Sequence, residues 1–205
     1  MLTRRRPALA DLYADVAAGW QAGIERLGYP AAYTALFTAA PLGAPGRVLD
    51  LGTGSGAFAE AALRAAELPA ESLALLDTSP EMLAAASARL QSHATTTTHN
   101  VPVGTDALPL SGFDTVLAAH VIEHLEDPQD ALRWCRARLA PGGQFYLAVS
   151  RPHWCTALLR WKWGHRAYRP ETVVALLKAA GFANVRHVAF PAGPPSRTSA
   201  GYVAT

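Results

Sequence analysis

Three glycines at alternate positions, Gly52, Gly54 and Gly56, constrain the fold of this 205-residue chain more than any other feature. They follow a short apolar run that includes Val48, and an alanine-rich stretch over residues 57–66 comes after them. A strand, a glycine turn and a helix in that order bring a ligand against bare backbone and the N–H groups at the helix start. The segment therefore predicts a site for a nucleotide-like cofactor.

The glycines fit two classes of cofactor, and an acidic residue beside them favours one class. Gly52, Gly54 and Ala57 satisfy the dinucleotide fingerprint G-x-G-x-x-G/A, which binds a pyrophosphate. Asp50, two residues before the first glycine, would repel a pyrophosphate, because like charges in a partly desolvated cleft are costly. It would favour the ammonium of S-adenosylmethionine (SAM), which carries a sulfonium and no phosphate. The sequence therefore predicts SAM rather than NAD.

A second acidic residue is expected beside the same loop. Asp77 ends an apolar run over residues 72–77, and Ser79 can cap a helix that begins at Pro80. The spacing from Gly56 leaves room for one helix and a right-handed crossover, which makes the two strands neighbours. Two carboxylate oxygens there can accept both ribose hydroxyls of an adenosine. This spacing supports a nucleoside without separating SAM from NAD.

Alternating strands and helices continue along the chain. Further strands are expected over residues 95–103, 113–119, 144–149, 185–190 and 202–204, with helices over 8–27, 30–40, 128–139 and 170–180. Buried strands that alternate with helices are typical of a doubly wound α/β sheet with mostly parallel strands. The last two strands can pair as a closing hairpin.

Six motifs follow one another along residues 48–182. They are VLDLGTGSG (48–56), LLDTSPEML (75–83), GTDALPL (104–110), FDTVLAAHVIEHLEDP (113–128), LAPGGQFYLAVSRP (139–152) and YRPETVVALLKAAGF (168–182). In this order they resemble the small-molecule branch of the class I SAM-dependent methyltransferases. The resemblance implies a Rossmann-like, seven-stranded, mostly parallel sheet with an antiparallel last strand, and S-adenosylhomocysteine as the product left from SAM.

A length of 205 residues predicts a single domain over residues 1–205, and the resemblance implies its parts and a set of cofactor contacts. The domain would comprise a helical lid (1–44), a SAM-binding core (45–150), a substrate cover (151–170) and a closing helix and hairpin (171–205). The methionine part, the ribose, the adenine and the methyl-bearing end would be held by Asp50, Leu51, Gly52, Thr53, Gly54, Gly56, Asp77, Thr78, Asp106, Ala107 and His120. His120 would contribute through its backbone.

Residues 151–170 combine basic and aromatic side chains without an acidic residue. A pocket wall that takes an anionic substrate group is the favoured interpretation. A surface for anionic lipid, a nucleic-acid surface and a solvated cover helix stay open as alternatives. The candidate substrate contacts are Tyr13, Trp20, His153, Trp154, His165 and Arg166. The first two belong to the predicted lid, where simple packing onto the core is the alternative.

A catalytic base is required only where the acceptor carries a proton. The candidates are His124, His153 and His165, and Glu123 could also face the substrate. His124 could instead satisfy backbone groups of its own turn. Residues 120–124 match the H-x-x-E-H motif of zinc proteases, but a strand precedes them and a new helix starts soon after, so the two imidazoles need not converge. No metal is expected.

Composition agrees with an ordinary cytoplasmic enzyme. The net charge of +2 is too small to imply nucleic acid, and no run approaches the ~20 apolar residues of a membrane span. Asp11 and Asp15 interrupt the N-terminal apolar stretch, which disfavours a signal peptide. Two cysteines, Cys135 and Cys155, make no disulfide framework. Peripheral membrane contact and the oligomeric state stay open.

These observations predict transfer of the sulfonium methyl of SAM to an N, O, S or C nucleophile of a small molecule by in-line displacement. Two alternatives stay open. One is a SAM-binding accessory or regulatory module without turnover. The other is a NAD-type oxidoreductase, which Asp50 and the lack of a second catalytic domain disfavour.

Overall fold

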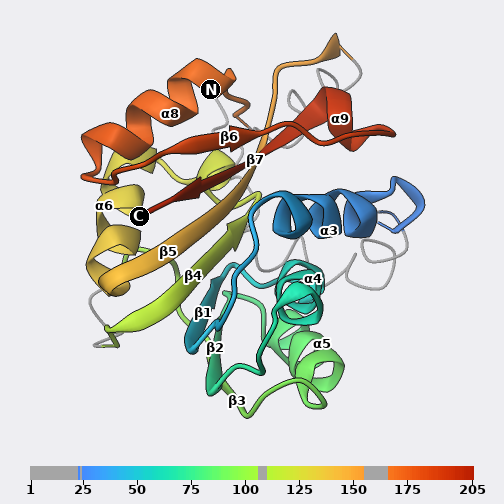
Figure 1. Cartoon of the computed structure of the whole chain (residues 1–205), viewed down its shortest axis with the longest axis vertical. Coiled ribbons are helices and arrows are strands. Elements are labelled where there is room, and N and C mark those ends of the chain that lie inside the picture. The colour runs from blue at the N-terminus through green and yellow to red at the C-terminus, as the bar shows by residue number, and fades with distance from the viewer. Residues whose placement is uncertain (1–22, 24, 106–109, 155–165) are drawn as a thin grey trace, which may run out of the picture.

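A seven-stranded sheet organises the protein (Figure 1). The computed structural model describes residues 23, 25–105, 110–154 and 166–205. The strands lie in the order β3-β2-β1-β4-β5-β7-β6, and β7 runs antiparallel to both of its neighbours. Their bounds are β1 Arg47–Leu51, β2 Ser72–Leu76, β3 Thr96–His99, β4 Phe113–Ala119, β5 Leu139–Ser150, β6 Arg186–Val188 and β7 Ser199–Ala204. The predicted doubly wound sheet with an antiparallel last strand is confirmed.

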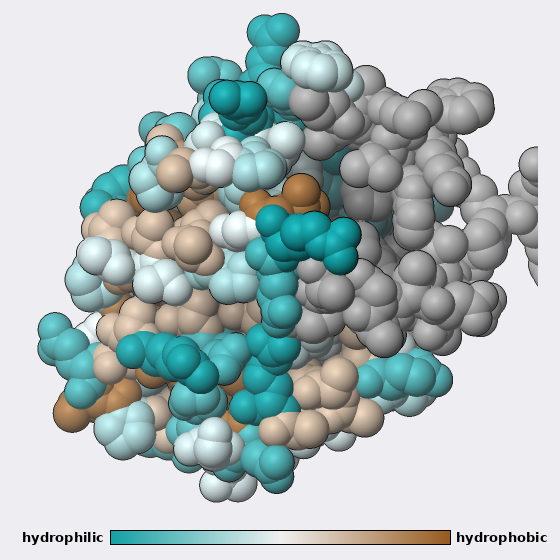
Figure 2. All heavy atoms as spheres, turned by 90° about the vertical axis from the view of Figure 1, so that its right-hand side faces the viewer, coloured by the Kyte–Doolittle hydropathy of each residue, from teal (hydrophilic) through white to brown (hydrophobic). Residues whose placement is uncertain are grey.

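Helices cover both faces of the sheet (Figure 1). One face carries α3 (Tyr29–Ala39), α4 (Ala57–Ala65) and α5 (Pro80–Leu90), and the other carries α6 (Pro128–Arg138) and α8 (Pro170–Ala179). Two short helices, η1 (Ile122–His124) and α9 (Pro195–Thr198), lie in connections. Figure 2 shows that the described surface on the α3 side mixes hydrophilic and mildly hydrophobic residues with a few strongly hydrophobic ones.

The central strand β1 is buried on both sides, which explains the apolar character of Val48, Leu49 and Leu51. Val48 packs into the cluster beneath α3, α4 and α5, whereas Leu49 and Leu51 pack into the cluster beneath α6 and α8. This alternation follows from the two-residue period of a strand. On either side of β1 lie β2 and β4, so the strand order reverses there. A ligand crevice is expected outside the carboxyl ends of strands at such a switch point.

Two predicted helix starts are confirmed by their capping bonds. The Ser79 hydroxyl accepts a hydrogen bond from the Met82 N–H at 3.2 Å, directly before α5. The Asp127 carboxylate accepts from the N–H groups of Gln129 and Asp130, both at 2.9 Å, before α6. In each case a proline follows the cap, where its missing N–H costs nothing.

The prediction of the third strand was too long. The strand β3 covers only Thr96–His99 instead of residues 95–103. The Asn100 side chain turns back to donate to the Asp77 carbonyl at 3.1 Å, and Pro102 has no N–H for a sheet ladder. The pairing on β2 therefore stops at His99.

The fifth strand begins earlier than predicted. Pro141, Gly142 and Gly143 were expected to separate a helix from the strand, but β5 already starts at Leu139. The register against β4 shifts between Phe113 and Thr115, so the glycines form an irregularity within the strand. A Cβ on Gly143 would lie 2.9 Å from the Phe113 carbonyl oxygen, so only glycine fits there.

The closing hairpin is confirmed with different bounds. Strand β7 begins at Ser199, three residues before the predicted start, and β6 is limited to Arg186–Val188. The proline-rich connection also contains the short helix α9, which was not predicted. Of the predicted helix over residues 8–27, all but its last part lies outside the described residues, as do Tyr13 and Trp20.

Candidate functional site

The glycine loop after β1 is fixed by contacts with the segments beside it. Gly52, Gly54 and Gly56 all have positive φ angles of 57°, 51° and 80°, which glycine adopts without strain. The Thr53 N–H donates to the Leu76 carbonyl at 3.0 Å and so ties the loop to the end of β2. A Cβ on Gly52 would lie 2.7 Å from the Val121 side chain, whereas one on Gly54 would meet nothing within 4 Å. The loop therefore presses against the end of β4 and leaves Gly54 facing open space.

Asp77 connects this loop to the start of α5. One of its carboxylate oxygens accepts from the Gly54 N–H and the other from the Ser79 N–H, both at 2.9 Å. The side chain is half-buried, and Thr78 beside it is exposed. A carboxylate in this position can exchange one of these bonds for the hydroxyls of a ribose.

Asp50 lies beneath the loop and is almost fully buried, with 1% of its surface exposed. The Thr53 hydroxyl donates to it at 2.5 Å. Burial raises the pKa of Asp50 to about 7, the Thr53 hydrogen bond opposes that rise, and the charge of Asp77 adds to it. A cation would stabilise the ionised form. Leu51 is fully buried beneath α6 and α8, so its side chain is turned away from the loop.

The predicted adenine contacts, Asp106 and Ala107, lie outside the described residues. The residue before them, Thr105, accepts a hydrogen bond from the Trp134 indole N–H through its carbonyl at 3.2 Å. A surface hollow next to this segment is lined by Val103, Gly104, Leu125, Glu126, Asp127, Asp130, Ala131 and Trp134. Apolar and polar groups both line the hollow.

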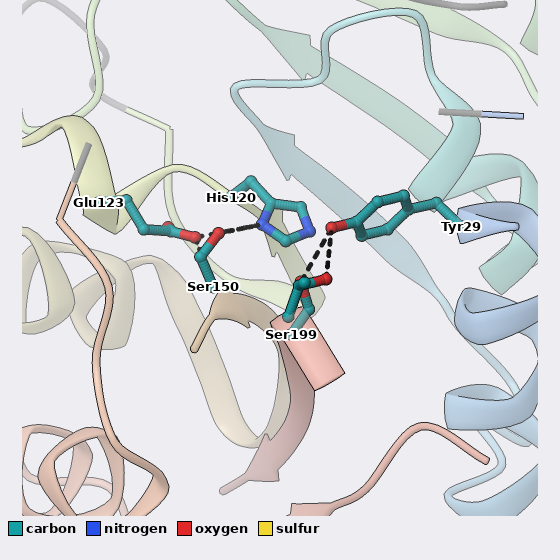
Figure 3. A network of polar contacts seen from close by, with 6 residues as sticks. Tyr29, His120, Glu123, Ser150 and Ser199 are labelled. Atoms are coloured by element: carbon teal, nitrogen blue, oxygen red, sulfur yellow. Dashed lines mark hydrogen bonds and ion pairs between the residues drawn. The ribbon is translucent and has the colours of Figure 1, made fainter. Parts of the chain in front are cut away.

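His120 directly follows β4 and lies at the centre of a polar network (Figure 3). Its φ angle of 58° is uncommon for a residue with a side chain. The backbone N–H still donates to the Ala148 carbonyl at 2.8 Å. The ring atom Nδ1 lies 3.1 Å from Glu123 Oε1 and 3.1 Å from Ser150 Oγ. The side chain is thus fixed from two neighbouring segments, an arrangement that the sequence does not predict.

Glu123, on η1, is 2% exposed and carries a negative charge in spite of this burial. Burial alone would raise the pKa of Glu123, but the hydrogen bond and the charge of His120 lower it, and so does the Ser150 N–H, which donates at 2.6 Å. The balance holds the pKa below its usual value. The carboxylate is therefore built to orient His120.

Two tyrosines of α3 face the other side of the imidazole. The Tyr29 ring meets His120 edge to face with ring centres 5.2 Å apart, and the Tyr33 ring lies 6.5 Å away. The Tyr29 hydroxyl shares a hydrogen bond with Ser199 Oγ at 3.0 Å (Figure 3). Burial raises the pKa of Tyr33 well above its usual value, so this phenol stays neutral. Aromatic surfaces therefore enclose His120 on this side.

The other predicted base and substrate residues make contacts of their own or lie outside the described residues, and the Arg166 N–H donates to the Glu123 carbonyl at 3.1 Å. His124 lies in η1, where its N–H donates to the Val121 carbonyl at 3.0 Å. His153 contacts Trp154, whose side chain is 82% exposed, with ring centres 5.8 Å apart. The Arg166 guanidinium donates to the Glu126 carbonyl at 2.9 Å. His165 is not among the described residues.

The H-x-x-E-H residues do not share a helix. His120 follows β4, and Glu123 and His124 belong to the three-residue helix η1. Within the described ranges, no group of three or more histidine, cysteine, aspartate or glutamate side chains is arranged to hold a metal ion.

The cysteine that the structure describes has a structural role. Cys135 is free and buried on α6, and burial raises its pKa to about 12, so its thiol is unreactive. Among the described helices, none combines the length and the apolar character needed to cross a bilayer. The cytoplasmic location stays a prediction.

Comparison with known proteins identifies the class. A family model described as a methyltransferase domain matches residues 23–187, and the chain therefore belongs to the class I SAM-dependent methyltransferases. It contains a SAM-dependent methyltransferase domain, which overrules the NAD-type alternative. Its family uses SAM as the methyl donor.

Individual relatives match parts of the chain or its fold. The ubiquinone biosynthesis O-methyltransferase of Xanthomonas campestris is 33% identical over 116 residues, which are 55% of this chain and 47% of that protein. The chain thus matches about half the length of such relatives. A SAM-dependent methyltransferase from Thermotoga maritima shares the fold with a TM-score of 0.75 at 18% identity, covering 97% of this chain and 99% of that one. The N-methyltransferase NodS of Bradyrhizobium japonicum, solved with S-adenosylhomocysteine, has a TM-score of 0.64 at 22% identity, covering 88% and 85%.

The residues around the glycine loop fit SAM chemically. Gly54 faces open space, and its N–H is already engaged by a carboxylate rather than left for a phosphate. Asp50 beneath it would gain from an ammonium, because a cation relieves the cost of its buried charge. A positively charged nucleoside without phosphate suits this arrangement better than a pyrophosphate does.

Proposed function

We propose that this methyltransferase transfers the methyl group of SAM to an N, O, S or C nucleophile of a small molecule by in-line displacement, leaving S-adenosylhomocysteine. The observation that supports this most is the Asp77 carboxylate on the Gly54 N–H, at the switch point between β1, β2 and β4. Acidic groups surround an open stretch of backbone there. When bound, SAM supplies a methyl group activated by its sulfonium.

Different residues would hold the different parts of SAM. Asp50 would face the ammonium, and Gly52–Gly56 would receive the methionine part against the backbone. Asp77 would accept the ribose hydroxyls, with Thr78 beside it, and Asp106 with Ala107 would face the adenine. The protein would then contribute orientation and the exclusion of water, which are its main means of accelerating a displacement.

Small molecules are proposed as acceptors for two reasons. The O-methyltransferase that matches over 116 residues is named for ubiquinone biosynthesis, and NodS is named as an N-methyltransferase. The net charge of +2 also provides little attraction for nucleic acid. Residues 151–170 remain the proposed cover over the acceptor.

The proposed ribose contact is tested by Asp77→Ala. We expect SAM affinity, measured by titration calorimetry, to fall by about 1–3 kcal/mol through the loss of charge-assisted hydrogen bonds. Glu71→Ala is the matched control, because Glu71 is an exposed carboxylate next to the opposite end of β2. Unchanged affinity in Asp77→Ala would contradict the ribose role.

A second measurement tests turnover itself. Release of S-adenosylhomocysteine is followed for the wild-type protein with SAM and a panel of phenols, amines and thiols. Acceptor-dependent release supports the proposed function. Tight SAM binding without any acceptor-dependent release across the panel would favour a non-catalytic SAM-binding module.

A further inference from the structure

The imidazole of His120 has one nitrogen engaged and one nitrogen left over. Nδ1 faces Glu123 and Ser150, at 3.1 Å from each oxygen. Nε2 is buried, and among the residues that the structure describes it finds no hydrogen-bond partner. Figure 3 shows this second nitrogen turned toward the Tyr29 side of the network. A buried ring nitrogen without a partner is costly in a merely structural histidine.

We propose that His120 is the general base of this enzyme, that Glu123 is its positioning residue, and that the acceptor is therefore a small hydroxyl compound, most suitably a phenol. The proposal rests on the proposed function, because it concerns the acceptor side of the same methyl transfer.

The carboxylate decides which ring nitrogen carries the proton. Glu123 is acceptor-only when ionised, and its charge is retained by the Ser150 N–H and the imidazole. Nδ1 must therefore be the donor, and in the neutral imidazole Nε2 then carries the lone pair. The same carboxylate stabilises the imidazolium that forms when Nε2 takes up a proton. The proton on Nδ1 and the charge of the carboxylate therefore both allow Nε2 to act as a base.

The position of His120 also suits a base. Its neighbour Val121 contacts the glycine loop, because a Cβ on Gly52 would lie 2.7 Å from the Val121 side chain. His120 thus lies at the end of β4 that borders the proposed SAM site, one residue from the loop contact. Tyr29 and Tyr33 place aromatic rings beside the imidazole, with centres 5.2 and 6.5 Å from its own, so a planar acceptor at Nε2 would meet aromatic surface.

Other titratable groups face the same network from each neighbouring element. Tyr29 and Tyr33 belong to α3, Asp50 to β1 and Tyr202 to β7. Burial raises the pKa values of Tyr33 and Tyr202, and both phenols also experience the charge of Glu123. These tyrosines stay neutral near neutral pH. Asp50 titrates near pH 7 and would respond to SAM rather than to the acceptor.

The proposed step balances in atoms and charge. The acceptor oxygen forms its new bond to the methyl carbon while its proton passes to Nε2. The electron pair of the broken carbon–sulfur bond remains on sulfur. The positive charge that leaves the sulfonium appears on the His120 imidazolium, beside the Glu123 carboxylate.

The test compares two acceptors that differ in their need for a base. The probes are 3,4-dihydroxybenzoate, a phenol that must lose a proton, and 4-nitrothiophenolate, which is already ionised at neutral pH. His120→Asn is the variant, because asparagine tolerates a positive φ angle. We expect kcat/KM for the phenol to fall about 100-fold near pH 7. Transfer to the thiolate should stay within about 3-fold, and the phenol defect should shrink as the pH rises.

Two further variants separate the roles. Glu123→Gln should lower kcat/KM for the phenol by about 10-fold, since it removes the charge that stabilises the imidazolium. His93→Asn is the matched control, because His93 follows α5, a helix that is not part of the network. It should leave both acceptors and the binding of S-adenosylhomocysteine unchanged.

A spectroscopic measurement needs no turnover. In the wild-type protein with the imidazole neutral, the ¹⁵N shifts of His120 should report a protonated Nδ1 and an unprotonated Nε2. The opposite tautomer would overturn the proposal. So would an equal fall of kcat/KM for the phenol and the thiolate in His120→Asn, or a wild-type protein that methylates only thiols. By contrast, a wild-type protein that binds no SAM, or methylates nothing, would contradict the proposed function, and the ¹⁵N result would still decide the tautomer.

Discussion

Two buried carboxylates at the same edge of the sheet behave in opposite ways. Asp50 and Glu123 are equally hidden, with 1% and 2% of their surface exposed. Burial raises the pKa of Asp50 to about 7, whereas the pKa of Glu123 is held below its usual value. Burial alone therefore does not decide whether a carboxylate in this site is charged.

The difference lies in the donors around each group. The hydrogen bond that holds down the pKa of Asp50 comes from one neutral hydroxyl, that of Thr53, at 2.5 Å. Glu123 receives a backbone N–H at 2.6 Å and faces an imidazole that can carry a positive charge. Donors that are charged or fixed in the backbone offset desolvation, and a single hydroxyl does not. The ionisation of Asp50 can therefore change when a cationic ligand binds, whereas Glu123 stays ionised beside His120.

The two groups also make opposite contributions to stability as the pH changes. Because the pKa of Asp50 is raised above 3.8 to about 7, its contribution is fully present below about pH 4 and is lost as the pH rises through 7. Because the pKa of Glu123 is lowered from 4.5, its contribution is present above about pH 4.5 and is lost as the pH falls through its folded value.

The largest effect that would sharpen this comparison is expected from Glu123→Ala. The change leaves the Ser150 N–H without its carboxylate acceptor and removes one of the two partners of His120 Nδ1. We expect the free energy of unfolding at pH 7 to fall by about 3 kcal/mol, as measured by chemical denaturation. Glu126→Ala, on the exposed residue just after η1, is the control and should change little. A loss below about 0.5 kcal/mol would show that Glu123 is not held as described.

Asp50→Asn should raise the free energy of unfolding, in contrast to Glu123→Ala. At about pH 8 the wild-type carboxylate is ionised in a buried position, so we expect the neutral amide to raise the free energy of unfolding by about 1–2 kcal/mol. The gain should vanish near pH 4. SAM affinity should rise from about pH 6 to pH 8 in the wild type, because the ionised carboxylate attracts the ammonium, and should be flat in the variant. A destabilised variant at pH 8 would break the comparison.

The smallest effect is expected from Thr53→Val. This change removes the hydroxyl that lowers the pKa of Asp50, at a cost of about 1 kcal/mol in the free energy of unfolding. The rise of SAM affinity with pH should move to higher pH by a fraction of a unit, as calorimetry at several pH values can measure. Ser55→Ala, in the same loop, serves as a comparison variant. A shift to lower pH would mean that the hydroxyl does not stabilise the ionised form.

The sequence predicts best where local chemistry and tertiary structure agree. The strand before Gly52, the crossover to Asp77 and the caps at Ser79 and Asp127 all follow from short-range rules. The extent of β5 does not, because its irregularity at Gly142 depends on pairing with β4, where Phe113 pairs with Leu139 and Thr115 pairs with Gln144. The proline and glycines at 141–143 predict the end of a helix and a turn, but β5 runs through them.

The polar network was missed for a similar reason. His120 and Glu123 are three residues apart, a spacing that could have suggested a pair, but His120 was predicted only as a backbone contact or a zinc ligand, and Glu123 as a residue that faces the substrate. The partners Ser150, Tyr29 and Ser199 come from three distant segments. The sheet order pairs Ser150 with Ser199, and helix α3 then brings Tyr29 to Ser199.

The bond between Tyr29 and Ser199 joins residues that are 170 positions apart. The donor side of the site, by contrast, is assembled from residues 50–79, whose contacts close short loops. Contacts across long loops are slow to form, so the cradle for the cofactor should be in place before the aromatic wall beside it is complete. During folding, the chain would then bind SAM before it could transfer the methyl group. Methyl-transfer activity would appear only in the last stage of folding.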